Sequence, residues 1–133
     1  MSGLVLKLRP GERILVNGVV LENGDRRAKL NIRTENAHIL RLRDAIHPND
    51  ANTPVRRVCY IAQMILAGEA DPKTGRRQLL LGIEQLSQVF TDPDSRAHLN
   101  QATESVVSER IYQALKSLRG LLAREQRLIQ RAG

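Results

Sequence analysis

Cationic side chains alternate with apolar ones through the segment RRAKLNIRTENAHILRLRD, residues 26–44. Side chains of a β-strand alternate between its two faces, so if Leu30 and Ile32, and later Leu40 and Leu42, face a core, the cations between them face away from it. A first strand with the same alternation adds two more cations. The cations predicted to share one sheet face are Lys7, Arg9, Arg27, Lys29, Arg33, Arg41 and Arg43. Such a face would attract phosphate, although solvent-facing strands are also commonly charged without any partner.

Residues that could perform catalysis or hold a metal are few and scattered. His38, His47 and His98 do not stand at a metal-ligand spacing such as C-x-x-C or H-x-x-x-H. Cys59 lies on an apolar helical stripe, where a lone cysteine is far more often a small core residue than a nucleophile. The glycines form neither a phosphate loop nor a dinucleotide fingerprint. We therefore predict no enzyme activity, no cofactor and no metal.

Composition supports an anionic partner for a chain of 133 residues. The 21 Lys and Arg residues exceed the 14 acids for a formal charge of +7, and all but four of the 21 are arginine, whose planar fork of donors suits phosphate and carboxylate. The three aromatic residues Tyr60, Phe90 and Tyr112 lie outside the strand-like region, which argues against an RNA recognition motif. Neither a secretion leader nor a spanning segment is recognised, and a single cysteine agrees with a reducing compartment, so we expect a cytoplasmic protein without membrane contact.

The elements that must position these cations change in character near residue 47. Alternating patterns predict strands at about 3–9, 12–17, 19–23, 27–34 and 38–43, with Asn17–Gly18 as a two-residue hairpin turn. Apolar spacings of three and four residues predict helices at about 54–67 and 75–90 and one long helix at about 96–130. Thr53 is the expected N-cap of the first helix, with Pro54 at its first position and Gly68 as its stop.

The predicted fold class is α+β, with a small N-terminal antiparallel β-sheet of about five strands followed by a three-helix C-terminal half. We expect residues 1–46 to form the β subdomain with the cationic face. Residues 53–133 are expected to form the helical subdomain, which supplies packing and partner binding. Within the helical part, Arg56 and Arg57 are read as solvated charges at the rim of the core, with a phosphate contact as the alternative.

Longer segments carry a family resemblance that covers nearly the whole chain. LVLKLRPGERILVNG, then ENGDRRAKLNIRTENAHILRLRDAI, then TPVRRVCYIAQMILAGEAD resemble the FlbT family of flagellum biosynthesis regulators, and PGERILVNG and TPVRRVCYIAQ are the most specific parts. This resemblance implies a post-transcriptional regulator of flagellin synthesis, which binds the 5′ untranslated region of flagellin mRNA and alters its stability or translation. Any mRNA degradation would then require a separate nuclease. It also implies the small regulator FlaF, or flagellin itself, as a protein partner.

A fainter resemblance covers only the strands. Gly11 and Glu12 match the Gly-Glu turn of the carbon storage regulator CsrA, Lys7 and Arg9 fall in the matching first strand, and Arg43 falls at the end of the last strand. That family binds RNA as a swapped-strand dimer, so the resemblance implies a homodimer and an RNA contact through the cationic face.

An alternative function rests on the helical half. Residues 110–133 carry a local excess of five positive charges beside an apolar stripe, which fits either a partner-binding helix or the solvent side of a core helix. A protein-interaction module of flagellar assembly that binds FlaF or flagellin through its helices is therefore the second interpretation. A helical DNA-binding repressor is disfavoured, because no short two-helix unit with a glycine turn and an exposed recognition face is evident.

Overall fold

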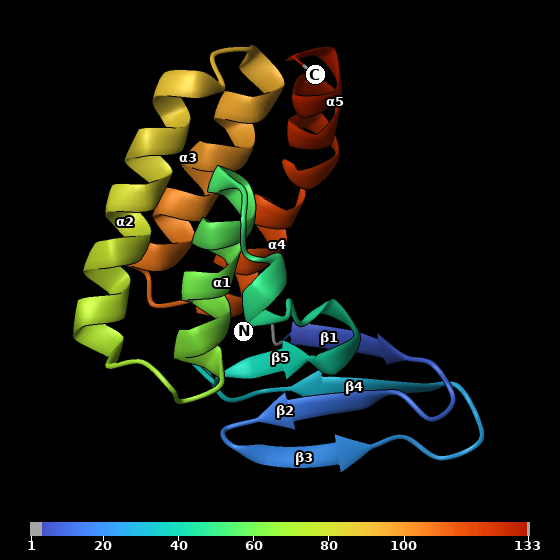
Figure 1. Ribbon diagram of the computed structural model, residues 1–133. Coiled ribbons are helices and arrows are strands. Elements are labelled where there is room, and N and C mark those ends of the chain that lie inside the picture. The colour runs from blue at the N-terminus through green and yellow to red at the C-terminus, as the bar shows by residue number, and fades with distance from the viewer. Residues whose placement is uncertain (1–3, 133) are drawn as a thin grey trace.

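The computed structural model describes residues 4–132, with short strands in the N-terminal third followed by helices (Figure 1). The strands are β1 (Leu4–Leu8), β2 (Arg13–Val16), β3 (Val19–Glu22), β4 (Ala28–Ile32) and β5 (Ile39–Arg41). Two 3-10 turns follow, η1 (Leu42–Asp44) and η2 (Pro48–Asp50). The helices are α1 (Pro54–Leu66), α2 (Pro72–Val89), α3 (Pro93–Val107), α4 (Ile111–Arg119) and α5 (Leu122–Ala132). The predicted α+β class is confirmed, with residue 3 of the first predicted strand outside the described residues.

The strands form two small antiparallel sheets where a single sheet was expected. β1 pairs with β4, while β2 lies between β3 and β5. Leu6 and Leu8 of β1 pack with Ile14 of β2 and Ile39 of β5, so this apolar cluster joins the two sheets. The hairpin between β2 and β3 turns at Asn17 and Gly18, both with positive φ, as the sequence predicts.

The first two helices begin at side-chain caps. Thr53 accepts a hydrogen bond from the Arg56 amide at the start of α1, and Asp71 accepts one from the Thr74 amide at the start of α2. α1 ends before Gly68, which adopts the left-handed conformation with a φ of +77°. The prediction of α1 over 54–67 is confirmed, and α2 begins three residues before the predicted start at 75 because its cap is Asp71.

The prediction of one long helix over 96–130 is wrong, because the chain reverses within it. Glu109 has a φ of +61°, which ends α3 and lets α4 return against α1 and α3. α4 ends at Gly120. This glycine packs so closely against His98 that an added Cβ would lie 2.5 Å from Cε1 of the histidine. The irregular spacing of apolar residues, at three or four positions, thus belongs to three shorter helices. Each of them turns its own apolar side to the core.

Two apolar clusters organise the described residues. The larger one is formed by the helices together with Leu40 of β5, and the smaller one lies between the two sheets. Tyr112 of α4 packs against both clusters, and α1 contacts β5, so both helices connect the strands to the helical core. Over residues 4–132, no helix has both the length and the apolar character needed to cross a membrane.

Candidate nucleic-acid interface

The outward face of the β1–β4 pair is cationic. Lys7 lies directly opposite Lys29, and Val5 lies opposite Asn31, so all four side chains share the face turned away from the inter-sheet core. Arg9 and Arg27 follow and precede these strands at one end, Arg33 lies at the other end, and all are exposed. We define the β1–β4 cationic face as Lys7, Arg9, Arg27, Lys29 and Arg33.

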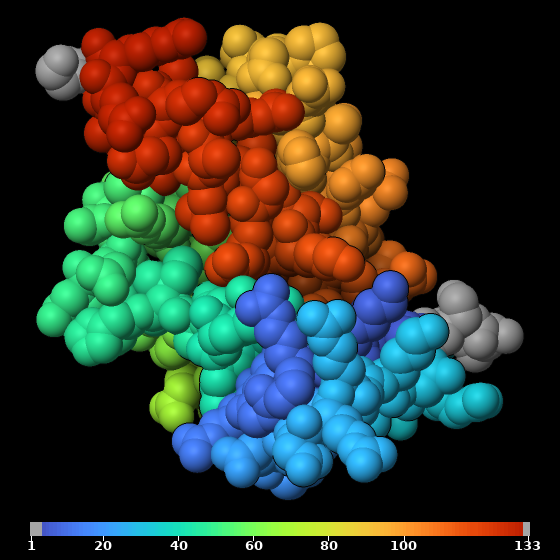
Figure 2. Space-filling model, turned by 90° about the vertical axis from the view of Figure 1, so that its right-hand side faces the viewer, coloured from blue at the N-terminus to red at the C-terminus, as the bar shows by residue number. Residues whose placement is uncertain are grey.

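This face keeps its charge unneutralised. Among residues 4–132, none of its five cations forms an ion pair. Like charges placed directly opposite on an antiparallel pair destabilise it, so the Lys7–Lys29 pair costs stability in the free protein. An anion bound between the two strands would relieve that repulsion. The space-filling view shows these strands as one surface below the segment that contains α4 (Figure 2).

The predicted outward orientation of Arg41 is wrong. Its Nε donates to Oε2 of Glu12 at 2.7 Å, its Nη2 donates to Oε1 at 2.9 Å and also to the Lys7 carbonyl at 2.5 Å. The Arg41 side chain is only 11% exposed and that of Glu12 only 4%. Both faces of β5 are covered, since Ile39 packs in the cluster between the sheets and Leu40 packs in the helical core. Alternation therefore gives this strand no free outward face.

The ion pair explains why Glu12 can be buried. Hydrogen bonds from Arg41 lower the pKa of the Glu12 carboxyl to about 2, with a further hydrogen bond from the Arg9 amide, and these outweigh the effect of burial. The same carboxylate raises the pKa of Arg41. Arg41 and Glu12 thus join the turn after β1 to the end of β5, and the predicted Gly-Glu turn is a structural element of the strand region.

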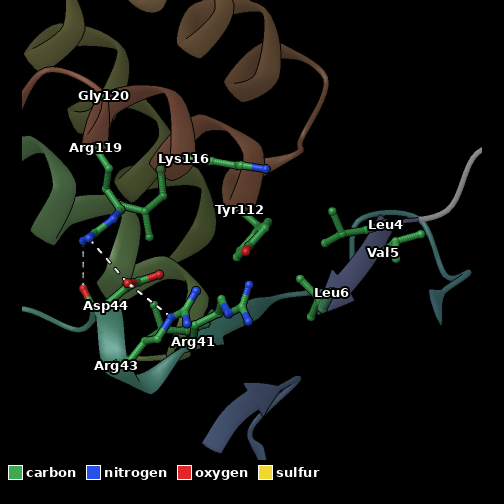
Figure 3. A pocket seen from close by; sticks show the side chains of 12 residues that line it. Leu4, Val5, Leu6, Arg41, Arg43, Asp44, Tyr112, Lys116, Arg119 and Gly120 are labelled. Carbon is green, nitrogen blue, oxygen red and sulfur yellow. Dashed lines mark hydrogen bonds and ion pairs between the residues drawn. The ribbon is translucent and has the colours of Figure 1, made fainter. Parts of the chain in front are cut away.

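Arg43 lies off the sheet, in η1, and faces a cleft instead of the β1–β4 cationic face. Its side chain is 39% exposed, and its Nε lies 3.7 Å from Glu12 and 3.8 Å from Asp44. From α4, Arg119 approaches the same Asp44, with Nη2 3.4 Å from the carboxylate and Nη1 donating to the backbone carbonyl at 3.2 Å (Figure 3).

Between β1, η1 and α4 lies a cleft of about 340 Å³, which we call the α4 cleft. One part of its lining is polar and includes Lys116, which also comes from α4 (Figure 3). The remaining lining is formed mainly by large apolar and aromatic side chains. These are Leu4, Val5, Leu6, Leu40, Tyr112 and Leu115.

Sequence reasoning missed the cleft, although part of its signal was present. Tyr112, Lys116 and Arg119 stand at positions i, i+4 and i+7, which places them along one side of a helix. The basic character of residues 110–133 is visible in the sequence, but nothing in the sequence indicates that this side of the helix meets η1. The structure therefore separates the seven predicted cations into the five of the β1–β4 cationic face, Arg41 in a buried ion pair, and Arg43 at the α4 cleft.

The prediction that Cys59 is a core residue is confirmed. Its side chain is fully buried in the helical cluster, and burial raises the pKa of its thiol to about 12. The thiol is therefore protonated at neutral pH and sealed from any substrate. Within the described part of the chain, no group of three His, Cys, Asp or Glu side chains gathers to hold a metal ion.

Comparison with known proteins gives one consistent family. The family model described as "Flagellar protein FlbT" matches residues 4–129. A protein of Allorhizobium ampelinum, named probable flagellum biosynthesis repressor protein FlbT, is 36% identical over 96% of this chain and 85% of its own length. Relatives with corresponding names from Bradyrhizobium diazoefficiens and Caulobacter sp. (strain K31) are 35% and 32% identical, each over 94% of this chain and over 84% and 95% of their own lengths. No solved structure matches the chain.

Proposed function

This chain belongs to the FlbT family of flagellar proteins, and we propose on that premise that it represses flagellum biosynthesis after transcription. It binds the 5′ untranslated region of flagellin mRNA in the cytoplasm and alters the stability or translation of that mRNA. Relatives named flagellum biosynthesis repressors support the regulatory part of this proposal. The contact surface is the β1–β4 cationic face.

The observation that carries the RNA contact is the Lys7–Lys29 pair. Two lysines directly opposite one another repel, and neither finds a carboxylate among the residues that the structure describes. Surface cations that lack an ion pair within the protein are suited to binding an anionic partner. Together with Arg9, Arg27 and Arg33 they give a strip along two strands that a single-stranded backbone could follow, because phosphates of RNA repeat along the chain.

The protein acts by binding, without chemistry of its own. The buried Cys59 thiol is unsuited to nucleophilic attack, and the buried Glu12 carboxylate is held by Arg41, so neither group is free for general acid–base catalysis. A change in mRNA stability would then come from access of a separate nuclease to the leader.

A mobility-shift assay with the flagellin leader and a scrambled competitor tests this proposal. The K7A/K29A double variant should bind the leader at least about tenfold more weakly at moderate salt, and its log–log salt slope should be smaller by about 1.4, roughly 0.7 for each lost phosphate contact. The control variant K73A/R77A removes two exposed cations from α2. An equal loss in the control would show that net charge alone drives binding, and no leader binding by the wild-type protein would overturn the proposal.

A second candidate function has its own observation, at the end of α5. Leu128 and Ile129 are 44% and 45% exposed, beside the exposed Arg127 and Arg131. The apolar side of this helix is therefore not covered by any of the residues that the structure describes. This favours a protein partner on α5, for which the family suggests FlaF or flagellin. Loss of partner binding in L128A/I129A with leader binding intact would separate this function from RNA binding.

The proposed homodimer would use an edge strand. β3 lies at the edge of its sheet, and Val19, Val20 and Leu21 are all at least 42% exposed. Pairing of β3 with its copy would cover these side chains and satisfy the strand edge. Light scattering on wild type and on V20K tests the contact, since a lysine on the edge should yield the monomer while leaving the circular dichroism spectrum unchanged.

A further inference from the structure

The α4 cleft has the size of a site for one small ligand. Its volume of about 340 Å³ lies at the lower end of the range of small-molecule sites, which extends from roughly 300 to 1,000 Å³. One part of its lining is apolar, from Leu6, Leu40 and Leu115, and another carries charge. A ligand that matches both parts must have an anionic end and a flat or apolar end.

The charged part retains a positive excess after its internal ion pairs are counted. Arg41, Arg43, Lys116 and Arg119 line the cleft, against the two carboxylates of Asp44 and the adjacent Glu12, which leaves two positive charges in excess. A phosphate monoester carries close to two negative charges at neutral pH and a phosphodiester carries one. The cleft is therefore charged for a phosphate group.

The guanidinium groups are held in place before any ligand arrives. The Asp44 carbonyl accepts a hydrogen bond from Arg119, and the Asp44 carboxylate forms ion pairs with Arg119 at 3.4 Å and with Arg43 at 3.8 Å, so the two arginines stand on either side of one residue (Figure 3). Both remain about one-third exposed or more, at 39% for Arg43 and 34% for Arg119. Lys116 is exposed and has no ion pair within residues 4–132, which leaves its ammonium group available.

The opposite end of the cleft offers groups that can recognise a base. Tyr112 places an aromatic ring in the lining, and base–aromatic stacking is tolerant of base identity. The Lys7 carbonyl accepts a hydrogen bond from Arg41, a residue that lines the cleft, so the N–H and C=O of Lys7 face away from β4, on the side of Arg41. Peptide groups alternate along a strand, so those of Val5 face the same way and present one donor and one acceptor.

We propose that the α4 cleft binds one unpaired nucleotide of the RNA. Its phosphate lies at Arg43 and Arg119, and its base lies against Tyr112, beside Lys116, with its edge towards Val5. This inference rests on the proposed RNA-binding function and adds a base-accepting site to it. Lys7 connects the two, because its side chain lies on the β1–β4 cationic face while its carbonyl accepts a hydrogen bond from Arg41, which lines the cleft. A single-stranded RNA that follows the β1–β4 cationic face can therefore place one nucleotide in the α4 cleft.

An extended acidic peptide paired with the free edge of β1 is a different occupant of the same cleft. The strand has five residues, and the Lys7 carbonyl is already bound by Arg41, so only the stretch from Leu4 to Leu6 could pair. That length allows little more than one residue pair, which is too short for strand addition to provide most of the affinity. The observations therefore favour the nucleotide.

The test uses the full chain with 5′-mononucleotides, inorganic phosphate and an acidic peptide as separate probes, followed by amide NMR shifts. Mononucleotides should shift Val5, Tyr112 and Lys116 at lower concentration than phosphate does. K116A, which changes an exposed side chain, should weaken mononucleotide binding about five- to tenfold. K73A, which removes an exposed lysine from α2, should leave it unchanged.

The outcomes separate the cleft from the proposed function. Equal binding of phosphate and mononucleotides would overturn the base contact, and shifts produced by the acidic peptide alone would overturn the nucleotide as the occupant. Leader binding that is weakened in K7A/K29A but unchanged in both K116A and R119Q would overturn the cleft site while leaving the proposed function standing. Should the wild-type protein bind no leader RNA at all, the proposed function fails, and the mononucleotide titration then decides the cleft by itself.

Discussion

Arg41 of β5 and Glu12, in the turn that precedes β2, form a two-point ion pair that is almost fully buried, with Nε to Oε2 at 2.7 Å and Nη2 to Oε1 at 2.9 Å. The same guanidinium donates to the Lys7 carbonyl of β1, which belongs to the other sheet. One arginine thus fastens the end of β5 to the turn after β1 and to β1 itself.

The first prediction is that R41A destabilises the fold. Removing one partner of a buried ion pair leaves the other charge buried and unpaired, so the free energy of unfolding should fall by about 3 kcal/mol or more. R43A removes a neighbouring arginine that is 39% exposed, and it should cost less than about 1 kcal/mol. Urea unfolding followed by circular dichroism measures both. Similar midpoints for the two variants would contradict the structural role of Arg41.

The second prediction concerns the loss of folding stability at low pH. The pKa of the Glu12 carboxyl is about 2 in the folded protein and about 4.5 when unperturbed, so the folded state favours the ionised form. Its contribution to stability is fully present above about pH 4.5 and is lost as the pH falls from there towards 2. The lost contribution is on the order of 2–3 kcal/mol, from about 1.4 kcal/mol per pKa unit with allowance for screening.

Comparing wild type with E12Q isolates this contribution. The N-cap carboxylates Asp71 and Asp92 also have lowered pKa values, through hydrogen bonds with Thr74 and Ser95, and they titrate in both proteins alike. The stability difference between wild type and E12Q, measured by urea unfolding, should therefore shrink between pH 5 and pH 2.5. A difference that stays constant over this interval would mean that Glu12 is not held ionised by Arg41.

The third prediction is that K29E changes stability and RNA binding in opposite directions. A glutamate opposite Lys7 replaces a repulsive cross-strand pair with an attractive one, which should raise the free energy of unfolding by about 0.2–1 kcal/mol. Leader affinity should fall, because the β1–β4 cationic face loses a phosphate contact and gains a negative charge. Urea unfolding and mobility shift on the same preparation provide the two readings. K73E serves as the control for the change in net charge, and a K29E protein that binds the leader as well as K73E does would argue against this face.

The fourth prediction uses the two halves of α5. Glu125 is buried and accepts hydrogen bonds from the Val55 amide at 2.8 Å and from the Thr53 hydroxyl, so it covers the start of α1. A chain ending at Gln126 retains this contact and loses Leu128 and Ile129. It should remain folded and keep its leader affinity, while a protein partner that binds α5 should be lost. Circular dichroism, mobility shift and partner pull-down measure the three.

A chain ending at Gly120 is the informative comparison. It also removes Glu125 and the fully buried Leu121, which leaves the first amides of α1 without their carboxylate and opens the helical core. We expect this shorter chain to melt at a clearly lower temperature than the one ending at Gln126. Equal melting temperatures would show that α5 contributes nothing to the cover of α1.

The sequence alone determined the local elements of this protein. Alternation and turn chemistry located all five strands and the Asn17–Gly18 hairpin, because side-chain direction and positive φ are settled within a few residues. Thr53 and Pro54 fixed the start of α1 for the same reason. The cations of β1 and β4 could be assigned to one face, since those strands have one covered side and one open side.

The tertiary structure decided what depends on how distant elements meet. Leu40 packs against helices and Ile39 against strands, so both sides of β5 are covered and Arg41 turns inward to Glu12, which no periodicity within the strand reveals. The left-handed turn at Glu109 sends α4 back along the core and brings Arg119 to Asp44, 75 residues apart in the chain. Burial and charge pairing depend on contacts between elements that are distant in the sequence. The spacing of apolar residues, with its period of two in strands and 3.6 in helices, indicates only which local elements form.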